Sequence, residues 1–143
     1  IDTQTPPHVY VVADLSCRAS PNEWAKQTVQ AYRELHANAV IPEKNNAGWV
    51  GSVLRAEGPD VYLDGVTARH SKRIRAEPVA ALYEQHRVHH VGRFDELETQ
   101  MVTWDPEEKW SPDRIDALVH AITWLAPWSK RPGIAVSAAE REI

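Results

Sequence analysis

The sequence predicts an α/β fold in which helices pack on a sheet. Short apolar runs typical of buried strands occur at 9–13, 39–41 and 61–63, and segments with helical spacing of apolar residues separate and follow them. The length of 143 residues suits one domain, and a content of 43% hydrophobic and 25% charged residues is that of an ordinary globular protein. These observations exclude collagenous, low-complexity and disordered classes.

The chain begins with a predicted strand and a well-marked helix. The strand, Val9 to Ala13, is β-branched and aromatic, and its nearly continuous apolarity predicts burial on both faces. The helix follows because Ser20-Pro21-Asn22-Glu23 has the pattern of a capping box with proline at the first helical position. Its apolar residues then recur at helical spacing, at Ala25, Val29, Tyr32 and Leu35.

Two further strands enclose a second helix. Ala39 to Ile41 is a short apolar run that ends at Pro42-Glu43, as expected for a buried strand. Asn45 or Asn46 is placed to cap the helix, which stops at Gly58-Pro59. Val61 to Leu63 is the next predicted strand.

The second half of the chain is predicted to form helices and one more short strand. A basic stretch, 69–75, leads into a helix with Pro78 expected in its first turn, and Arg87 to Val91 is a short strand. Leu97, Met101 and Val102 mark a short helix. Ser111-Pro112 opens the last helix, which stops at Pro127 and has one apolar stripe, formed by Ile115, Leu118, Val119, Ile122 and Leu125.

Three carboxylates are candidate site residues. Glu43 follows a predicted strand, at the edge where open α/β sheets bind ligands, although a first solvated loop residue has the same pattern. Asp113 and Asp116 share one helix face, and Asp113 also suits the positive end of a helix dipole. Asp116 lies beside the apolar stripe, where a carboxylate is costly unless it is paired with an arginine or bound to a cation. Oxygen ligands without cysteine indicate Mg²⁺ or Mn²⁺ rather than zinc.

Charge limits a nucleic-acid function to a local surface. The chain has 16 Lys and Arg against 20 Asp and Glu, a net charge of -4. The stretch 69–75 is nevertheless a basic island without an acid, and Lys72, Arg73 and Arg75 suit contact with a phosphate backbone. A solvated surface is the equal alternative.

Other chemistry has little support in the sequence. No phosphate-binding loop and no G-x-G-x-x-G motif occurs, so ATP hydrolysis and dinucleotide binding are not indicated. His86, His89 and His90 could suggest a metal site, but alternation along a short strand places His89 and His90 on opposite faces, which favours ordinary surface histidines. Core packing explains the six tryptophans. A single cysteine, Cys17, forms no internal disulfide and suits a reducing, cytosolic compartment. No run is apolar and long enough for a membrane span.

Four segments in order resemble the C-terminal nuclease domain of tailed-phage terminase large subunits. They are IPEKNNAG (41–48), SKRIRAEPV (71–79), GRFDELETQM (92–101) and SPDRIDALV (111–119). The resemblance spans about Tyr10 to Leu125 and implies a ribonuclease H-like mixed sheet flanked by helices. It implies cutting of concatemeric double-stranded DNA with two Mg²⁺ or Mn²⁺ ions. Glu43 and Asp116 match the metal-binding acids, Asp113 matches an auxiliary acid, and Lys72, Arg73 and Arg75 match the DNA-binding segment.

The resemblance also implies partners and a missing part. The partners would be an upstream terminase ATPase domain, a small terminase subunit and a portal protein, in the host cytoplasm during phage assembly. Residues 1–128 would form the nuclease domain, N-terminally incomplete, and 129–143 a tail. The family's first metal-binding aspartate lies on an opening strand that is lacking here, for which Asp2 is a poor substitute and Asp14 a remote one. The chain is therefore expected to be part of a longer protein, and a non-catalytic DNA- or portal-docking module is the alternative.

A structural prediction follows from the lacking strand. In the implied fold it lies between 10–13 and 39–41 and hydrogen-bonds to both. An empty slot would leave unpaired backbone groups on apolar strands, which proteins avoid. We expect residues upstream of Ile1, or a strand of a neighbouring molecule, to fill it.

Overall fold

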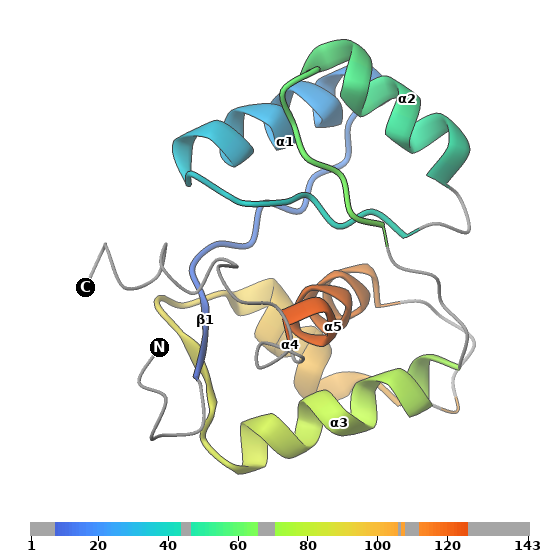
Figure 1. The fold of residues 1–143 in the computed structure, drawn as a ribbon. Coiled ribbons are helices and arrows are strands. Elements are labelled where there is room, and N and C mark those ends of the chain that lie inside the picture. Colours follow the sequence, from blue (N-terminus) through green and yellow to red (C-terminus); the bar gives the residue numbers. More distant parts are fainter. Residues whose placement is uncertain (1–7, 44–46, 66–70, 106, 108–111, 126–143) are drawn as a thin grey trace. The chain divides into compact units, whose positions relative to one another are not determined.

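The computed structural model describes residues 8–43, 47–65, 71–105, 107 and 112–125 (Figure 1). These residues fall into two compact units. The first comprises the described residues of 1–16 and 70–127, and the second comprises those of 17–69. Each unit is described by itself.

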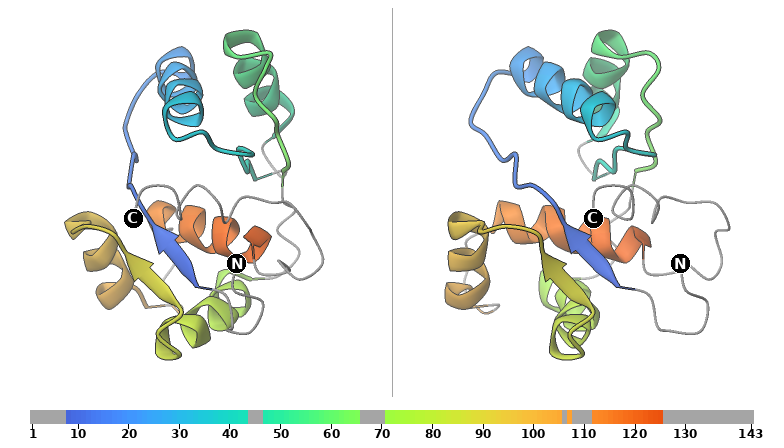
Figure 2. Two further views of the ribbon diagram at one scale, coloured as in Figure 1. Left: turned by 60° about the vertical axis from the view of Figure 1, so that its left-hand side comes forward. Right: turned by 90° about the vertical axis from the view of Figure 1, so that its left-hand side faces the viewer.

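The first unit contains a parallel pair of strands and three helices. Strand β1 (Val9–Val11) pairs with β2 (Val88–His90), so that Val9 faces Val88 and Val11 faces His90. Helix α3 (Lys72–Glu84) leads into β2, and α4 (Asp95–Thr103) and α3 each pack against α5 (Asp113–Leu125). Figure 2 shows the two strand arrows side by side. The buried apolar residues of this unit are Val9, Val79, Val88, Leu97, Ile115, Val119, Ile122 and Trp124.

The second unit is a pair of helices packed on an apolar cluster. Helices α1 (Pro21–Glu34) and α2 (Ala47–Glu57) contact each other, and Val40 forms a parallel bridge with Leu63. The cluster consists of Ala25, Val29, Leu54 and Val61, with partly buried neighbours. Gly58 ends α2 against this cluster, where an added Cβ would lie 2.8 Å from both methyl groups of Val29. A side chain at position 58 would therefore collide with the core.

The clearest helix signals of the sequence are confirmed. The Glu23 carboxylate accepts hydrogen bonds from the Ser20 backbone N–H, at 2.9 Å, and from the Ser20 hydroxyl, at 2.6 Å, so the cap of α1 forms as its pattern predicts. Helix α5 begins after Pro112 and buries its apolar stripe. The proposed caps of α2, Asn45 and Asn46, lie outside the described residues.

The predicted strands are shorter and less buried than expected. The strand at 9–13 extends only to Val11, and its predicted burial on both faces is wrong, because Tyr10 and Val12 are exposed. Among the described residues β1 pairs with β2 alone, so one edge of β1 has no described strand beside it. The runs at 39–41 and 61–63 contribute one bridge rather than full strands.

The start of α3 corrects a further prediction. Pro78 was expected in the first turn, but the helix begins at Lys72 and Pro78 lies in its interior. The Ser71 hydroxyl caps the helix by accepting from the Ile74 N–H at 3.4 Å. This earlier start makes residues 72–75 of the basic segment helical and places Lys72 and Arg75 one turn apart, on the same side.

Candidate metal and DNA-binding site

Asp116 is the candidate acid whose surroundings the structure defines most fully. It lies in the first turns of α5, one residue after the buried Ile115, and its side chain is 22% exposed. Asp113 begins the same helix and is exposed. The sequence predicts an arginine or a metal ion beside Asp116, and the arginine is present.

Two cations from α3 pair with the Asp116 carboxylate. The Lys72 ammonium is 2.7 Å from Oδ2, and the Arg75 guanidinium is 3.6 Å from Oδ1. The Arg75 side chain is only 14% exposed, against 35% for Lys72. Two of the residues predicted to contact DNA and the acid predicted to bind metal therefore form one cluster.

His120 completes this cluster and was not singled out from the sequence. It lies one turn after Asp116 on α5, is 8% exposed, and its Nε2 is 2.8 Å from Nη1 of Arg75. A guanidinium only donates hydrogen bonds, so Nε2 accepts and His120 is neutral, with its proton on Nδ1. The available signal was the spacing of four residues from Asp116, which places both side chains on one helix face.

Arg73 differs from the other basic residues of the segment. Its side chain is 60% exposed and pairs with Glu77 at 3.5 Å and with Glu107 at 3.1 Å. It thus lies on the surface of α3, whereas Arg75 faces α5.

Glu43 belongs to the second unit. It is half-buried and follows the bridged residue Val40 by three positions, near the end of the predicted strand. Residues 44–46 directly after it lie outside the described residues. The structure describes Glu43 and Asp116 in separate units, so it leaves their predicted convergence untested.

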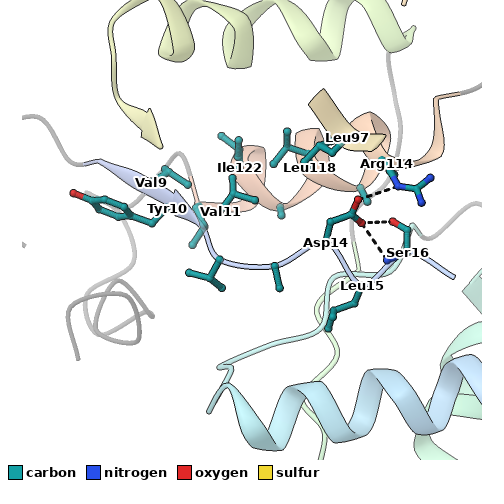
Figure 3. Close-up of a pocket in the computed structure, with 15 residues that line it drawn as sticks. Val9, Tyr10, Val11, Asp14, Leu15, Ser16, Leu97, Arg114, Leu118 and Ile122 are labelled. Atoms are coloured by element: carbon teal, nitrogen blue, oxygen red, sulfur yellow. Dashed lines mark hydrogen bonds and ion pairs between the residues drawn. The ribbon is translucent and has the colours of Figure 1, made fainter. Parts of the chain in front are cut away.

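A second paired carboxylate, Asp14, lies beside an apolar groove in the first unit (Figure 3). The groove has a volume of about 400 Å³ and is lined by β1, residues 12–16, Leu97 and one face of α5. Arg114 donates to Asp14 at 2.9 Å and also pairs with Glu96. Burial alone would raise the pKa of Asp14, but hydrogen bonds from the Ser16 hydroxyl and N–H and from Arg114 outweigh it and hold that pKa below its ordinary value.

The two histidines of β2, His89 and His90, contact different neighbours, as the alternation of side chains along a strand predicts. His89 stacks on His8 and Tyr10, whereas His90 contacts the Tyr83 hydroxyl at 2.8 Å and Glu98 at 3.0 Å. Burial, and then the charge of Glu98, raise the pKa of Tyr83 to about 12. His89 and His90 are half-buried and hydrogen-bonded, so their description as ordinary surface residues is wrong, whereas His86 is exposed as predicted.

Asp116 is the member of the cluster whose oxygen atoms suit a hard cation, and the described residues do not complete a metal site. Its carboxylate already pairs with two permanent cations, Lys72 and Arg75, which are not metal ligands. Within the described ranges, no three His, Cys, Asp or Glu side chains are grouped to hold a metal ion. Asp116 is thus one candidate metal ligand, and any further metal ligands would have to lie outside this cluster.

Comparison with known proteins identifies the family. The family described as terminase RNaseH-like domain matches residues 9–124. The chain therefore belongs to the terminase RNase H-like domain family, in agreement with the resemblance of its four sequence segments. No curated protein and no solved structure matches it significantly. None of the helices in the described part of the chain is long and apolar enough to cross a membrane.

Proposed function

We propose that this domain is a metal-dependent endonuclease that cuts concatemeric double-stranded DNA during viral DNA packaging. The observation that carries the proposal is the half-buried Asp116 carboxylate, paired with two cations of the basic segment, in a chain of the terminase RNase H-like family. A carboxylate in this position is costly without positive charge, and it provides the oxygen ligands that Mg²⁺ and Mn²⁺ prefer.

In this proposal Glu43 and Asp116 hold the two ions, and Asp113 supports the site from the start of α5. Divalent ions, when bound, would activate water and stabilise the leaving oxygen of the phosphodiester. Arg75, anchored on His120, orients the Asp116 carboxylate. Lys72 and Arg73 lie on the more exposed part of the segment and would position the DNA backbone.

The proposed partners follow from this activity. They are double-stranded DNA, an upstream terminase ATPase domain, a small terminase subunit and a portal protein, in the host cytoplasm. Membership of the terminase family supports partners of this general kind.

Plasmid cleavage with Mg²⁺, Mn²⁺ or EDTA tests the proposal. Glu43→Gln and Asp116→Asn should each abolish metal-dependent cleavage while the circular dichroism spectrum stays unchanged, because each removes a ligand without opening a cavity. Asp113→Asn should lose less activity. Asp60→Asn is the matched control, since Asp60 also pairs with an arginine, Arg33, at an exposed position.

The outcomes separate the two candidate functions. The experiment should use the chain both alone and joined to the proposed upstream ATPase domain. Full activity of Asp116→Asn would contradict the site. DNA binding without cleavage under any metal condition would favour the non-catalytic docking module.

A further inference from the structure

Strand β1 is paired along one edge, and its other edge has none of the usual protection of a free strand. The Val9 N–H donates to, and the Val11 carbonyl accepts from, backbone groups that flank β2, at 2.8 and 2.9 Å. Alternate residues of a strand bond to opposite sides, so Tyr10 and Val12 direct their backbone groups to the other edge, where no described strand lies. The run 9–13 contains no charged residue and no proline. Free edges usually carry such residues, so we expect this edge to be paired.

The apolar groove of the first unit is bounded by this same segment of chain and by α5 (Figure 3). On the α5 side its lining includes Ala117 and Ala121, which are small and exposed, and Leu118 and Leu125, which are half-buried. Because the two alanines are four positions apart, they lie on one helix face and leave room for another backbone. The free edge of β1 and an uncovered flank of α5 therefore border one apolar space.

We propose that a second copy of this chain covers the groove, through antiparallel pairing of the two β1 strands across a twofold axis. One segment supplies the free edge, a wall of the groove and three exposed apolar side chains, those of Tyr10, Val12 and Leu15. Two copies are therefore complementary to each other, as a twofold contact requires. In the register that uses the outward groups of both residues, Tyr10 pairs with Val12 of the second copy, and the two Val11 residues meet at the axis.

This pairing joins the strand pairs of the two copies into one continuous sheet. A twofold axis perpendicular to the sheet leaves both α5 helices on the same face, where they approach each other along Ala117 and Ala121. The charged residues of the described lining, Asp14 and Arg114, already pair with each other at 2.9 Å. The contact therefore buries apolar surface and backbone hydrogen bonds without leaving an unpaired charge.

Sedimentation velocity over a range of concentrations measures the dimer, and substitutions locate its interface. Val12→Pro removes an outward N–H that β2 does not use, and Ala121→Arg places a long charged side chain in the groove. Each should raise the dissociation constant of the dimer at least about tenfold. Thr123→Arg is the matched control, because Thr123 is exposed on α5 outside the groove lining, and it should leave the dimer unchanged. Circular dichroism checks each fold, and Ala121→Arg preserves the test if Val12→Pro does not fold.

Amide hydrogen exchange of the wild type tests the same edge without a substitution. The Tyr10 amide should exchange more slowly as the protein concentration rises, because the second copy accepts its hydrogen bond. The Val9 amide is the internal control, since it donates to the Arg87 carbonyl within one copy and its protection should not depend on concentration.

The outcomes distinguish the possible occupants of the groove. A dimer that is weakened by Val12→Pro and Ala121→Arg but not by Thr123→Arg, with concentration-dependent protection of Tyr10, supports the proposal. A wild type that stays monomeric up to about 1 mM would overturn it, as would a dimer that neither substitution weakens. If a chain ending at Leu125 dimerises whereas the full chain does not, residues 126–143 occupy the groove and the proposal is wrong.

Discussion

The two units of this chain join their helices with different chemistry. In the second unit, α1 and α2 pack through an apolar cluster around Leu54, and the Arg33–Asp60 ion pair lies exposed at the surface. In the first unit, the contact between α3 and α5 includes the partly buried Arg75, Asp116 and His120. The second unit shows that an apolar joint is enough to pack two helices. Partly buried charges contribute little net stability. We therefore attribute the charges between α3 and α5 to the proposed function rather than to helix packing.

The largest effect that would test this comparison is the loss of the apolar joint. Leu54→Ala should lower the free energy of unfolding by about 2 to 5 kcal/mol, because Leu54 is almost fully buried and its neighbours cannot close the cavity completely. Urea denaturation gives the value. Val102→Ala, at a highly exposed position of α4, should change it by less than about 0.5 kcal/mol. A similar loss in both variants would contradict the packing described for the second unit.

A smaller effect is expected at the polar joint. Arg75→Met should cost about 1 to 3 kcal/mol, since it removes the hydrogen-bond donor of His120 and one of the two cations at Asp116. Arg33→Met, which breaks an exposed pair, should have little or no effect on stability. The same urea titrations compare the two arginines. Equal losses would show that the buried position of Arg75 has no energetic consequence.

The smallest effect concerns pH and the second paired carboxylate of the first unit. Folding lowers the pKa of Asp14, so its contribution to stability is present above its unfolded pKa and is lost as the pH falls through the lower, folded pKa. Asp14→Asn should be less stable than the wild type at pH 7, by no more than about 1 kcal/mol, and the difference should close below about pH 4. Melting temperatures from pH 7 to pH 3 test this. Ser16→Ala should reproduce part of the effect, and a gap as large at pH 3 as at pH 7 would point to packing instead.

Local signals predicted the helices better than the strands. The capping box at Ser20 and Glu23 and the stripe of α5 depend on contacts a few residues apart, which sequence spacing reveals. The pairing of β1 with β2 joins residues about eighty positions apart, and no spacing rule specifies that partner. The exposure of Tyr10 and Val12 is likewise not specified by the apolar run, because burial depends on which elements pack over each face of β1. A strand that fills the slot beside β1 stays a prediction.

The candidate site was predicted residue by residue but not as an arrangement. Lys72, Arg75 and Asp116 were identified from charge and from the resemblance, with the basic residues assigned to DNA. Their pairing depends on how α3 packs against α5, which their separate patterns do not contain. His120 was missed because a single histidine on an apolar stripe is usually a core residue.

The sequence by itself determined the α/β class, the family, the helices with strong caps, and the need for a positive partner at Asp116. These depend on local spacing, residue chemistry and the order of four segments. Only the tertiary structure decided that the partners are Lys72 and Arg75 and that His120 anchors Arg75. The physical reason is that residues more than forty positions apart meet only when two helices pack. Which of several similar cations then reaches a carboxylate depends on the start and rotation of each helix.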